Sequence, residues 1–296
     1  MKLTRCLWQA QTYLAAVDEA RQQVVLIGGP LADNTDPVRD LIAGRAALPD
    51  TTTTESGNRV ALADVQLLSP FARFDRNPFA VGKNYHEHAL EFDQSGFNAT
   101  SGASAIPAFP QIFSKATTSL VGPGDAIRFD PSYTRAVDYE GEVGVVIGER
   151  CRNVSRADAM DKVFGFVLLN DVTARDLQKN HAQWFLGKSL DTFCPLGPWI
   201  ATRDEIDVGA LQLQTFINDE LRQDAPLSQL IFDIPTLIET LSRGTTLLPG
   251  DIIATGTPAG VGIGFTPPRF LKDGDVVRIT APGLGELVNP VQEVAA

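Results

Sequence analysis

The chain has 296 residues, 44% of them hydrophobic, which is enough apolar material for one large globular core with a small appended domain. Its net charge of -11, from 36 acidic and 25 basic residues, excludes the basic surface that binding to nucleic acid or an anionic membrane requires. No apolar run reaches the 18 residues of a membrane span. We therefore expect neither nucleic acid nor membrane as a partner.

Cys6, Cys151 and Cys194 lie far apart and lack C-x-x-C spacing. Three widely spaced cysteines fit free thiols in a reducing compartment better than a disulfide framework. Lys2 and Arg5 are not followed by the continuous apolar core of a signal peptide. The sequence predicts a cytoplasmic protein.

The first part of the chain predicts a small N-terminal domain, residues 1–72, before a larger domain, residues 73–296. It contains a short apolar run at 24–27, a candidate helix at 37–47 and a polar stretch at 49–58, PDTTTTESGN, that a core would exclude. We expect the boundary near the end of this segment.

Residues 93–110 are rich in Gly, Ser, Ala and Pro, a composition typical of a long surface loop. A loop of this length is either a lid over a functional site or a disordered insertion. The composition leaves both interpretations open.

A Gly-Asp turn followed by a β-branched run recurs at 122–129, 248–255 and 272–279, and each copy predicts a strand that begins after a tight turn. Candidate helices begin near Ser155 and Pro235. Strands outnumber helices and do not alternate with them. The predicted fold class is therefore strand-rich α+β.

The stretch DYEGEVGVVIG, residues 138–148, predicts a strand in which Glu140 and Glu142 point to the same face, because side chains alternate with a period of two. If that face is buried, the two carboxylates need a proton or a cation. A solvated edge strand with outward glutamates is the alternative.

A continuous apolar run at 163–170 ends abruptly in Asp171, and residues 172–178 have helical character. Gln178 follows Asp171 by seven positions, about two helical turns, and is expected on nearly the same face. A helix N-cap is another role for Asp171, but it leaves the glutamate pair unexplained. Three carboxylates without Cys or His favour a hard cation such as Mg²⁺, with water or substrate in its remaining positions.

Several segments resemble the fumarylacetoacetate hydrolase family, especially its acylpyruvate hydrolases and 2-hydroxyhepta-2,4-diene-1,7-dioate isomerases. They are VGKNYHEHALEF (81–92), KATTSLVGPGDAI (115–127), VDYEGEVGVVIG (137–148), GFVLLNDVTARDLQ (165–178), GKSLDTFCPLGPWI (187–200) and PGDIIATGTPAGVG (249–262). The first 70 residues show no such match. The resemblance implies a catalytic domain with a mixed β-roll, a divalent metal (Mg²⁺ or Mn²⁺) and a homodimer.

The resemblance also implies the site residues. Glu140, Glu142 and Asp171 match the metal ligands, in agreement with the interpretation of these residues by themselves. His88 and Glu91 match an H-x-x-E motif; three positions apart on a helical turn, they share a face, so Glu91 can orient the imidazole while His88 takes a proton from water. The further expected residues are catalytic Lys188 and substrate-binding Gln178, Arg175, Thr257 and Lys115.

The predicted function is Mg²⁺-dependent hydrolysis of a C–C bond in a small 2,4-dioxo acid, such as an acylpyruvate or fumarylpyruvate, in aromatic compound catabolism. The metal and Lys188 would supply positive charge where the pyruvate enolate develops. Decarboxylation of oxaloacetate and isomerisation or hydration of a 2-oxo diacid are alternatives within the family. A non-catalytic, metal-stabilised interaction protein is the alternative from another class, and loss of the H-x-x-E pair or of Lys188 would be its mark.

Overall fold

The computed structural model describes residues 1–32, 35–47, 59–97 and 105–295. Two sequence predictions fall on segments outside the described residues. One is the polar stretch at 49–58. The other is the lid or disordered loop, of which residues 98–104 are not described.

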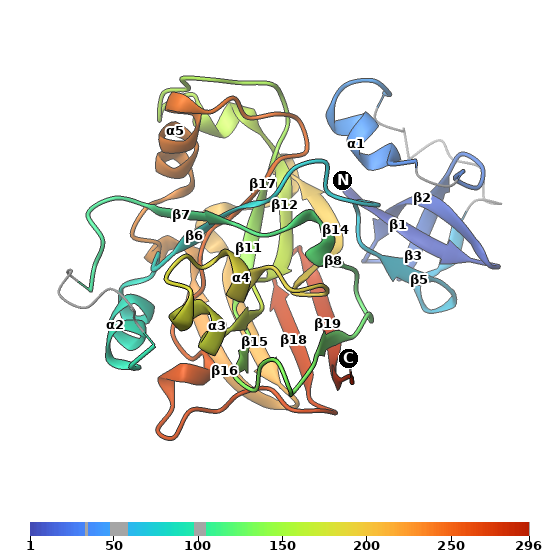
Figure 1. Ribbon diagram of the computed structural model, residues 1–296. Coiled ribbons are helices and arrows are strands. Elements are labelled where there is room, and N and C mark those ends of the chain that lie inside the picture. Colours follow the sequence, from blue (N-terminus) through green and yellow to red (C-terminus); the bar gives the residue numbers. More distant parts are fainter. Residues whose placement is uncertain (33–34, 48–58, 98–104, 296) are drawn as a thin grey trace.

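A large mixed sheet runs through the molecule (Figure 1). Its order is β4-β3-β2-β1-β14-β12-β11-β17-β6-β7, with β5 paired to β1 and β8 to β14. The strands are β1 (Lys2–Trp8), β2 (Gln11–Asp18), β3 (Gln23–Ile27), β4 (Arg59–Ala61), β5 (Gln66–Leu68), β6 (Phe79–Gly82), β7 (Gln111–Ser114), β8 (Leu120–Val121), β11 (Gly141–Ile147), β12 (Val163–Asn170), β14 (Cys194–Thr202) and β17 (Ile252–Ala254). Every residue of β11 is buried, as expected for a strand with neighbours on both sides.

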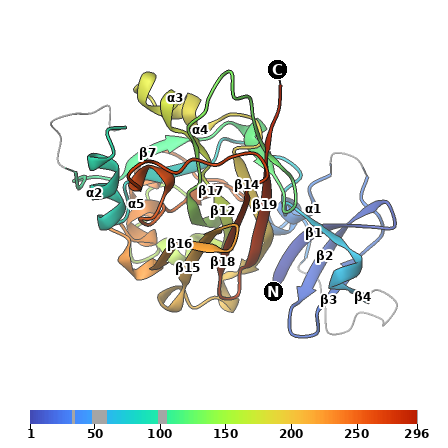
Figure 2. The ribbon, with the colours of Figure 1, turned by 90° about the horizontal axis from the view of Figure 1, so that it is seen from below.

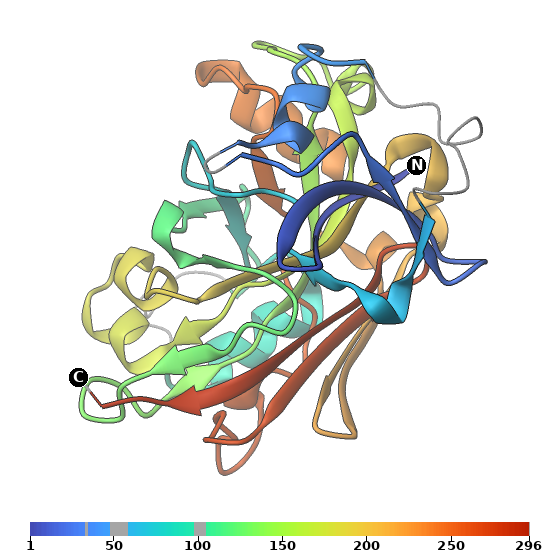
Figure 3. The same cartoon turned by 90° about the vertical axis from the view of Figure 1, so that its right-hand side faces the viewer.

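A second sheet of five strands has the order β16-β15-β18-β19-β9, and β10 pairs with β13 in a short ribbon. Figure 3, with the N-terminal strands toward the viewer, shows the red C-terminal strands running below them along the molecule. The bounds are β9 (Ile127–Phe129), β10 (Val137–Asp138), β13 (Thr173–Ala174), β15 (Gln212–Ile217), β16 (Glu220–Pro226), β18 (Val276–Ala281) and β19 (Gly285–Glu293). The strand-rich α+β prediction is confirmed.

The three Gly-Asp turns each precede a strand, as predicted: β9, β17 and β18. Gly124, Gly250 and Gly274 have φ of 81°, 84° and 82°, a left-handed conformation that glycine adopts without steric cost. Each turn also uses its aspartate, which accepts a backbone N–H from three residues earlier. The pairs are Gly122 N to Asp125 at 2.8 Å, Leu248 N to Asp251 at 2.9 Å and Lys272 N to Asp275 at 2.9 Å.

The N-terminal strands lie on the opposite side of the molecule from α2 (His86–Gln94) in both Figure 1 and Figure 2. They join the large sheet through β1, whose residues pair with β14 in antiparallel register. The predicted run at 24–27 is β3, and the predicted helix at 37–47 is the shorter α1 (Pro37–Ile42). The domain boundary at residue 72 remains a prediction.

The remaining helices are α3 (Arg175–Asn180), α4 (Phe185–Lys188) and α5 (Ile234–Gly244). The helix predicted near Pro235 is α5, which begins at the cap residue Asp233. None of the helices in the described ranges is long and apolar enough to cross a membrane.

The helix predicted from Ser155 is wrong. Ser155 Oγ instead donates to Asp158 Oδ2 at 2.6 Å within a turn, and only a short 3-10 turn, Ala159–Lys162, follows. Val163 already begins β12, because its β-branched and aromatic run pairs with β11 on one side and β14 on the other.

Candidate active site

Three carboxylates meet at the end of the central strand pair. One oxygen from each of Glu140, Glu142 and Asp171 lies within 4.8 Å of the others, and all three residues are buried. The antiparallel register of β11 and β12 brings them together, and Asp171 N donates to Glu140 O at 2.8 Å. The predicted strand at 138–148 is interrupted at Tyr139 and Glu140, between β10 and β11, yet the glutamates still converge. The solvated edge-strand alternative is wrong, because β11 lies between β12 and β17.

Two lysines neutralise part of this negative charge. Lys188 Nζ lies 2.6 Å from Glu140 Oε2 and 2.7 Å from Asp171 Oδ2. Lys115 Nζ lies 2.6 Å from the other oxygen of Asp171. Burial by itself would raise the pKa of Glu140, but Lys188 and then Arg175 lower it to about 2.

Among the described residues, no lysine or arginine forms an ion pair with Glu142. Burial first, and then the charges of Asp171 and Glu140, raise the pKa of Glu142 well above its ordinary value. Its Oε2 accepts a hydrogen bond from Gly256 N at 2.7 Å. A carboxyl group that is buried beside two others is stabilised in its charged form by a nearby cation. Three hard oxygen donors with this excess of negative charge therefore fit Mg²⁺ or Mn²⁺.

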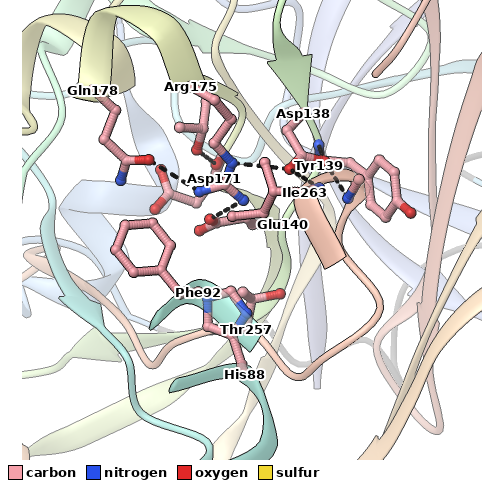
Figure 4. A network of polar contacts seen from close by, with 12 residues as sticks. His88, Phe92, Asp138, Tyr139, Glu140, Asp171, Arg175, Gln178, Thr257 and Ile263 are labelled. Carbon is pink, nitrogen blue, oxygen red and sulfur yellow. Dashed lines mark hydrogen bonds and ion pairs between the residues drawn. The ribbon is translucent and has the colours of Figure 1, made fainter. Parts of the chain in front are cut away.

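A buried arginine, Arg175, connects the carboxylate cluster to a further acidic residue, Asp138 (Figure 4). Arg175 lies 2.7 Å from Glu140 Oε1 and donates to Asp138 Oδ2 at 2.9 Å and to Gln178 Oε1 at 3.1 Å. Asp138 also accepts from Gly262 N at 2.6 Å. Sequence reasoning missed Asp138, although the period-two alternation that singled out the glutamates includes it.

His88 and Glu91 lie together on α2, as the H-x-x-E spacing predicts. His88 Nδ1 is 3.1 Å from Glu91 Oε2, and Glu91 Oε1 accepts from Gly260 N at 3.0 Å. With Nδ1 turned toward the carboxylate, Nε2 is left for a substrate or water.

One small cavity is lined both by Glu140 of the carboxylate cluster and by His88 of the H-x-x-E pair. It is lined by Val81, Gly82, Lys83, His88, Phe92, Glu140, Arg175, Gln178, Trp184, Lys188 and Thr257. Its free volume of about 10 Å³ has room for about one water molecule. A substrate can therefore enter only if some of these side chains move. Lys83, Phe92 and Trp184 were not predicted as site residues, although Lys83 and Phe92 lie in the segment that contains the H-x-x-E motif.

The residues expected to bind substrate differ in whether they line the cavity and in the hydrogen bonds they already make within the protein. Arg175 and Gln178 reach the cavity from one face of α3, three positions apart. Thr257 also lines it, but its hydroxyl donates to Gly141 O at 2.9 Å and accepts from Gln223 Nε2 at 2.7 Å. Lys115 is fully buried behind the cluster.

Gln178 lies near the site, but the reason given for expecting it there, a helix face shared with Asp171, is wrong. Asp171 precedes α3, which begins at Arg175, so the two residues do not share a helix face. The N-cap alternative for Asp171 is wrong as well, because the N-cap position belongs to Ala174.

Comparisons with known proteins agree with this arrangement. Residues 77–292 match the family model described as fumarylacetoacetate (FAA) hydrolase C-terminal. Oxaloacetate tautomerase YisK of Bacillus subtilis is 47% identical over 233 residues, which cover 78% of this chain and 74% of that protein. The structure of a fumarylacetoacetate hydrolase from psychrophilic Exiguobacterium antarcticum gives a TM-score of 0.84 at 37% identity, covering 99% of this chain and 100% of that one. Maleylpyruvate hydrolase from Sphingobium sp. SYK-6, solved with manganese (II) ion and pyruvate, gives a TM-score of 0.77 at 32% identity and covers 99% of each chain.

Proposed function

The chain belongs to the fumarylacetoacetate hydrolase family, and on that premise we propose that it interconverts the keto and enol forms of a small 2-oxo acid of the oxaloacetate type. One observation carries the proposal: a single buried cavity is lined both by Glu140, from the carboxylate cluster, and by His88, whose imidazole is oriented by Glu91. The similarity to oxaloacetate tautomerase YisK supports tautomerisation over the C–C hydrolysis expected first from the sequence.

The carboxylate cluster would hold the metal. Glu140, Glu142 and Asp171 suit Mg²⁺ or Mn²⁺, which when bound supplies positive charge for the carboxylate and keto oxygens of a 2-oxo acid. Lys188 supplies a second positive charge for the developing enolate. Burial lowers the pKa of Lys188, but the carboxylates of Asp171 and Glu140 outweigh burial and hold the pKa above its ordinary value.

His88 is the proposed proton carrier. Because Glu91 holds Nδ1, the lone pair of Nε2 is free to take a proton from the carbon beside the keto group. Returning a proton to the enolate oxygen completes the keto-to-enol conversion, and the reverse steps give the keto form. No water is consumed and no C–C bond breaks.

Hydrolysis of a 2,4-dioxo acid is the second candidate, and the His88–Glu91 pair is the observation that favours it. Here His88 would take a proton from water, the water oxygen would attack the C4 carbonyl, and the C3–C4 bond would break to leave a pyruvate enolate that is then protonated. The non-catalytic alternative lacks its expected mark, since the pair and Lys188 are both present and buried or nearly so.

A substrate panel separates these candidates. Freshly dissolved enol-oxaloacetate is followed by loss of its ultraviolet absorbance, with pyruvate assayed in parallel to detect decarboxylation. Acetylpyruvate and fumarylpyruvate are assayed for hydrolysis products, each with Mg²⁺ and with Mn²⁺. Accelerated enol loss without pyruvate supports the proposal, whereas cleavage of an acylpyruvate with no effect on oxaloacetate replaces it with hydrolysis. No turnover of any member favours the non-catalytic alternative.

Two variants test the assigned roles. His88→Ala should abolish turnover while Mn²⁺ binding, measured by calorimetry, persists, and Glu142→Ala should remove both. His181→Ala is the matched control, because His181 is an exposed histidine at the end of α3. Full activity in the His88 variant would exclude it as the proton carrier.

The homodimer and the cytoplasmic location also remain predictions. Sedimentation velocity of the purified protein measures the first, and fractionation of the source cells measures the second.

A further inference from the structure

We propose that Lys83 binds the second carboxylate of the substrate and so selects 2-oxo dicarboxylic acids over 2-oxo monocarboxylic acids. This inference rests on the proposed function, because it concerns the same cavity. It assigns a role to a residue that sequence reasoning did not select.

The position of Lys83 suits this role. It directly follows β6, lines the cavity and is 4% exposed. Its backbone has a φ of 54°, a left-handed conformation that is uncommon for a residue with a side chain. The surrounding fold therefore holds Lys83 in a costly conformation with its long side chain inside the protein.

Lys83 differs from the other cations that line the cavity in making no ion pair with a described residue. Arg175 and Lys188 both lie within 3 Å of Glu140. Within the described ranges, no carboxylate oxygen lies within 4.0 Å of Lys83 Nζ. Its ammonium lies over the ring of Phe92, whose centroid is 5.0 Å from Nζ, and the carboxylate of Asp93 acts on it from more than 4.0 Å away. A buried ammonium that is not ion-paired gains free energy when an anion binds directly beside it.

The position of His88 determines how the substrate is oriented in the cavity. The carbon that exchanges a proton must come within reach of the imidazole, which lies on α2 one turn before Phe92. The group attached to that carbon therefore extends along the α2 side of the cavity, where Phe92 and Lys83 lie. In oxaloacetate this group is the second carboxylate, and in acetylpyruvate it is an uncharged acyl group.

The test measures binding, so it does not depend on turnover. Calorimetry on Mn²⁺-loaded protein gives the Kd of pyruvate, with one carboxylate, and of 3,3-difluorooxaloacetate, a non-enolisable compound with two. Lys83→Met should weaken binding of the dicarboxylate by about 10- to 100-fold, the usual range for a hydrogen-bonded charge pair, and binding of pyruvate less than about 2-fold. Lys83→Arg should retain most of the preference.

The matched control is Lys179→Met. Lys179 also lies near an aromatic ring, 5.6 Å from the centroid of Phe97, but it is exposed and does not line the cavity. The Lys179→Met variant should bind pyruvate and 3,3-difluorooxaloacetate as tightly as the unsubstituted protein does. Circular dichroism and the unfolding temperature establish that each variant is folded.

Three outcomes decide the matter. Selective loss of dicarboxylate binding in Lys83→Met supports the inference, even if no keto–enol activity is found, so that failure of the proposed function is distinguishable. Equal weakening of both compounds would show that Lys83 only maintains the cavity. Unchanged binding of both compounds would overturn the inference directly, whatever the activity assays show.

Discussion

Gly264 leaves no room for a side chain beside Glu91: a methyl group on Gly264 would come within 1.7 Å of Glu91 Oε1. Glu91 Oε2 lies 3.1 Å from His88 Nδ1, and Glu91 Oε1 accepts a hydrogen bond from Gly260 N at 3.0 Å. The loop that contains Gly260 and Gly264 therefore fixes the carboxylate that orients the imidazole. This loop lies more than 160 residues after Glu91 in the chain.

Gly264→Ala should lower kcat by about 10-fold or more, because the methyl group displaces Glu91 while His88 remains present. Mn²⁺ binding should change less than about 2-fold, since the metal ligands are elsewhere. Gly244→Ala is the control, because a methyl group there meets nothing within 4 Å. Equal activity of the two variants would mean that the position of Glu91 is unimportant for turnover.

Lys188→Met should bind Mn²⁺ more tightly, by several-fold to about 10-fold, because the ammonium between Glu140 and Asp171 competes electrostatically with a divalent cation. Turnover should nevertheless fall about 100-fold or more, because the charge for the enolate is lost. Calorimetry and steady-state assays check the two parts. Weaker Mn²⁺ binding in this variant would contradict the competition.

Asp138→Asn should reduce the free energy of unfolding by about 3 kcal/mol, because it leaves the fully buried Arg175 without one of its two acidic partners. The exposed pair of Arg278 and Glu286, 3.2 Å apart, gives the control: Glu286→Gln should cost less than about 1 kcal/mol. Urea denaturation measures both. A change in the Asp138 variant as small as in the control would show that the buried pair adds no net stability.

Burial raises the pKa of the Cys6 thiol to about 11 and that of Cys194 to about 12. At pH 8 these thiols hold very little thiolate, so a disulfide reagent should modify them about 100-fold more slowly in folded protein than in denaturant. Since the folded pKa values exceed the unfolded ones, their contribution to stability is complete below about pH 8.5 and is lost as the pH rises toward 11 to 12.

Stability should therefore fall with increasing pH above about 9. In Cys194→Ala, which lacks one of these thiols, the fall should be shallower even though its stability at neutral pH is lower. Rapid modification of Cys6 and Cys194 in folded protein at pH 8 would contradict the burial on which this prediction depends.

Local patterns in the sequence were sufficient for several features. The Gly-Asp turns predicted three strands because glycine and aspartate have specific backbone roles in turns. The alternation of Glu140 and Glu142 and the abrupt end of an apolar run at Asp171 predicted the carboxylate cluster. The turns and the glutamate pair depend only on neighbours a few residues apart, where local geometry fixes the outcome.

Apart from Asp138, the features that sequence reasoning missed depend on contacts between residues far apart in the chain. Ser155 has a helix-start pattern, but pairing with two other strands takes the following residues into β12. Lys115 Nζ contacts Asp171, 56 residues further along the chain, and Lys83 lies over the ring of Phe92. Neither contact could be predicted from the sequence. Which charges pair with one another is decided only when the sheets bring these segments together, because an ion pair depends on distance in space and not on separation along the chain.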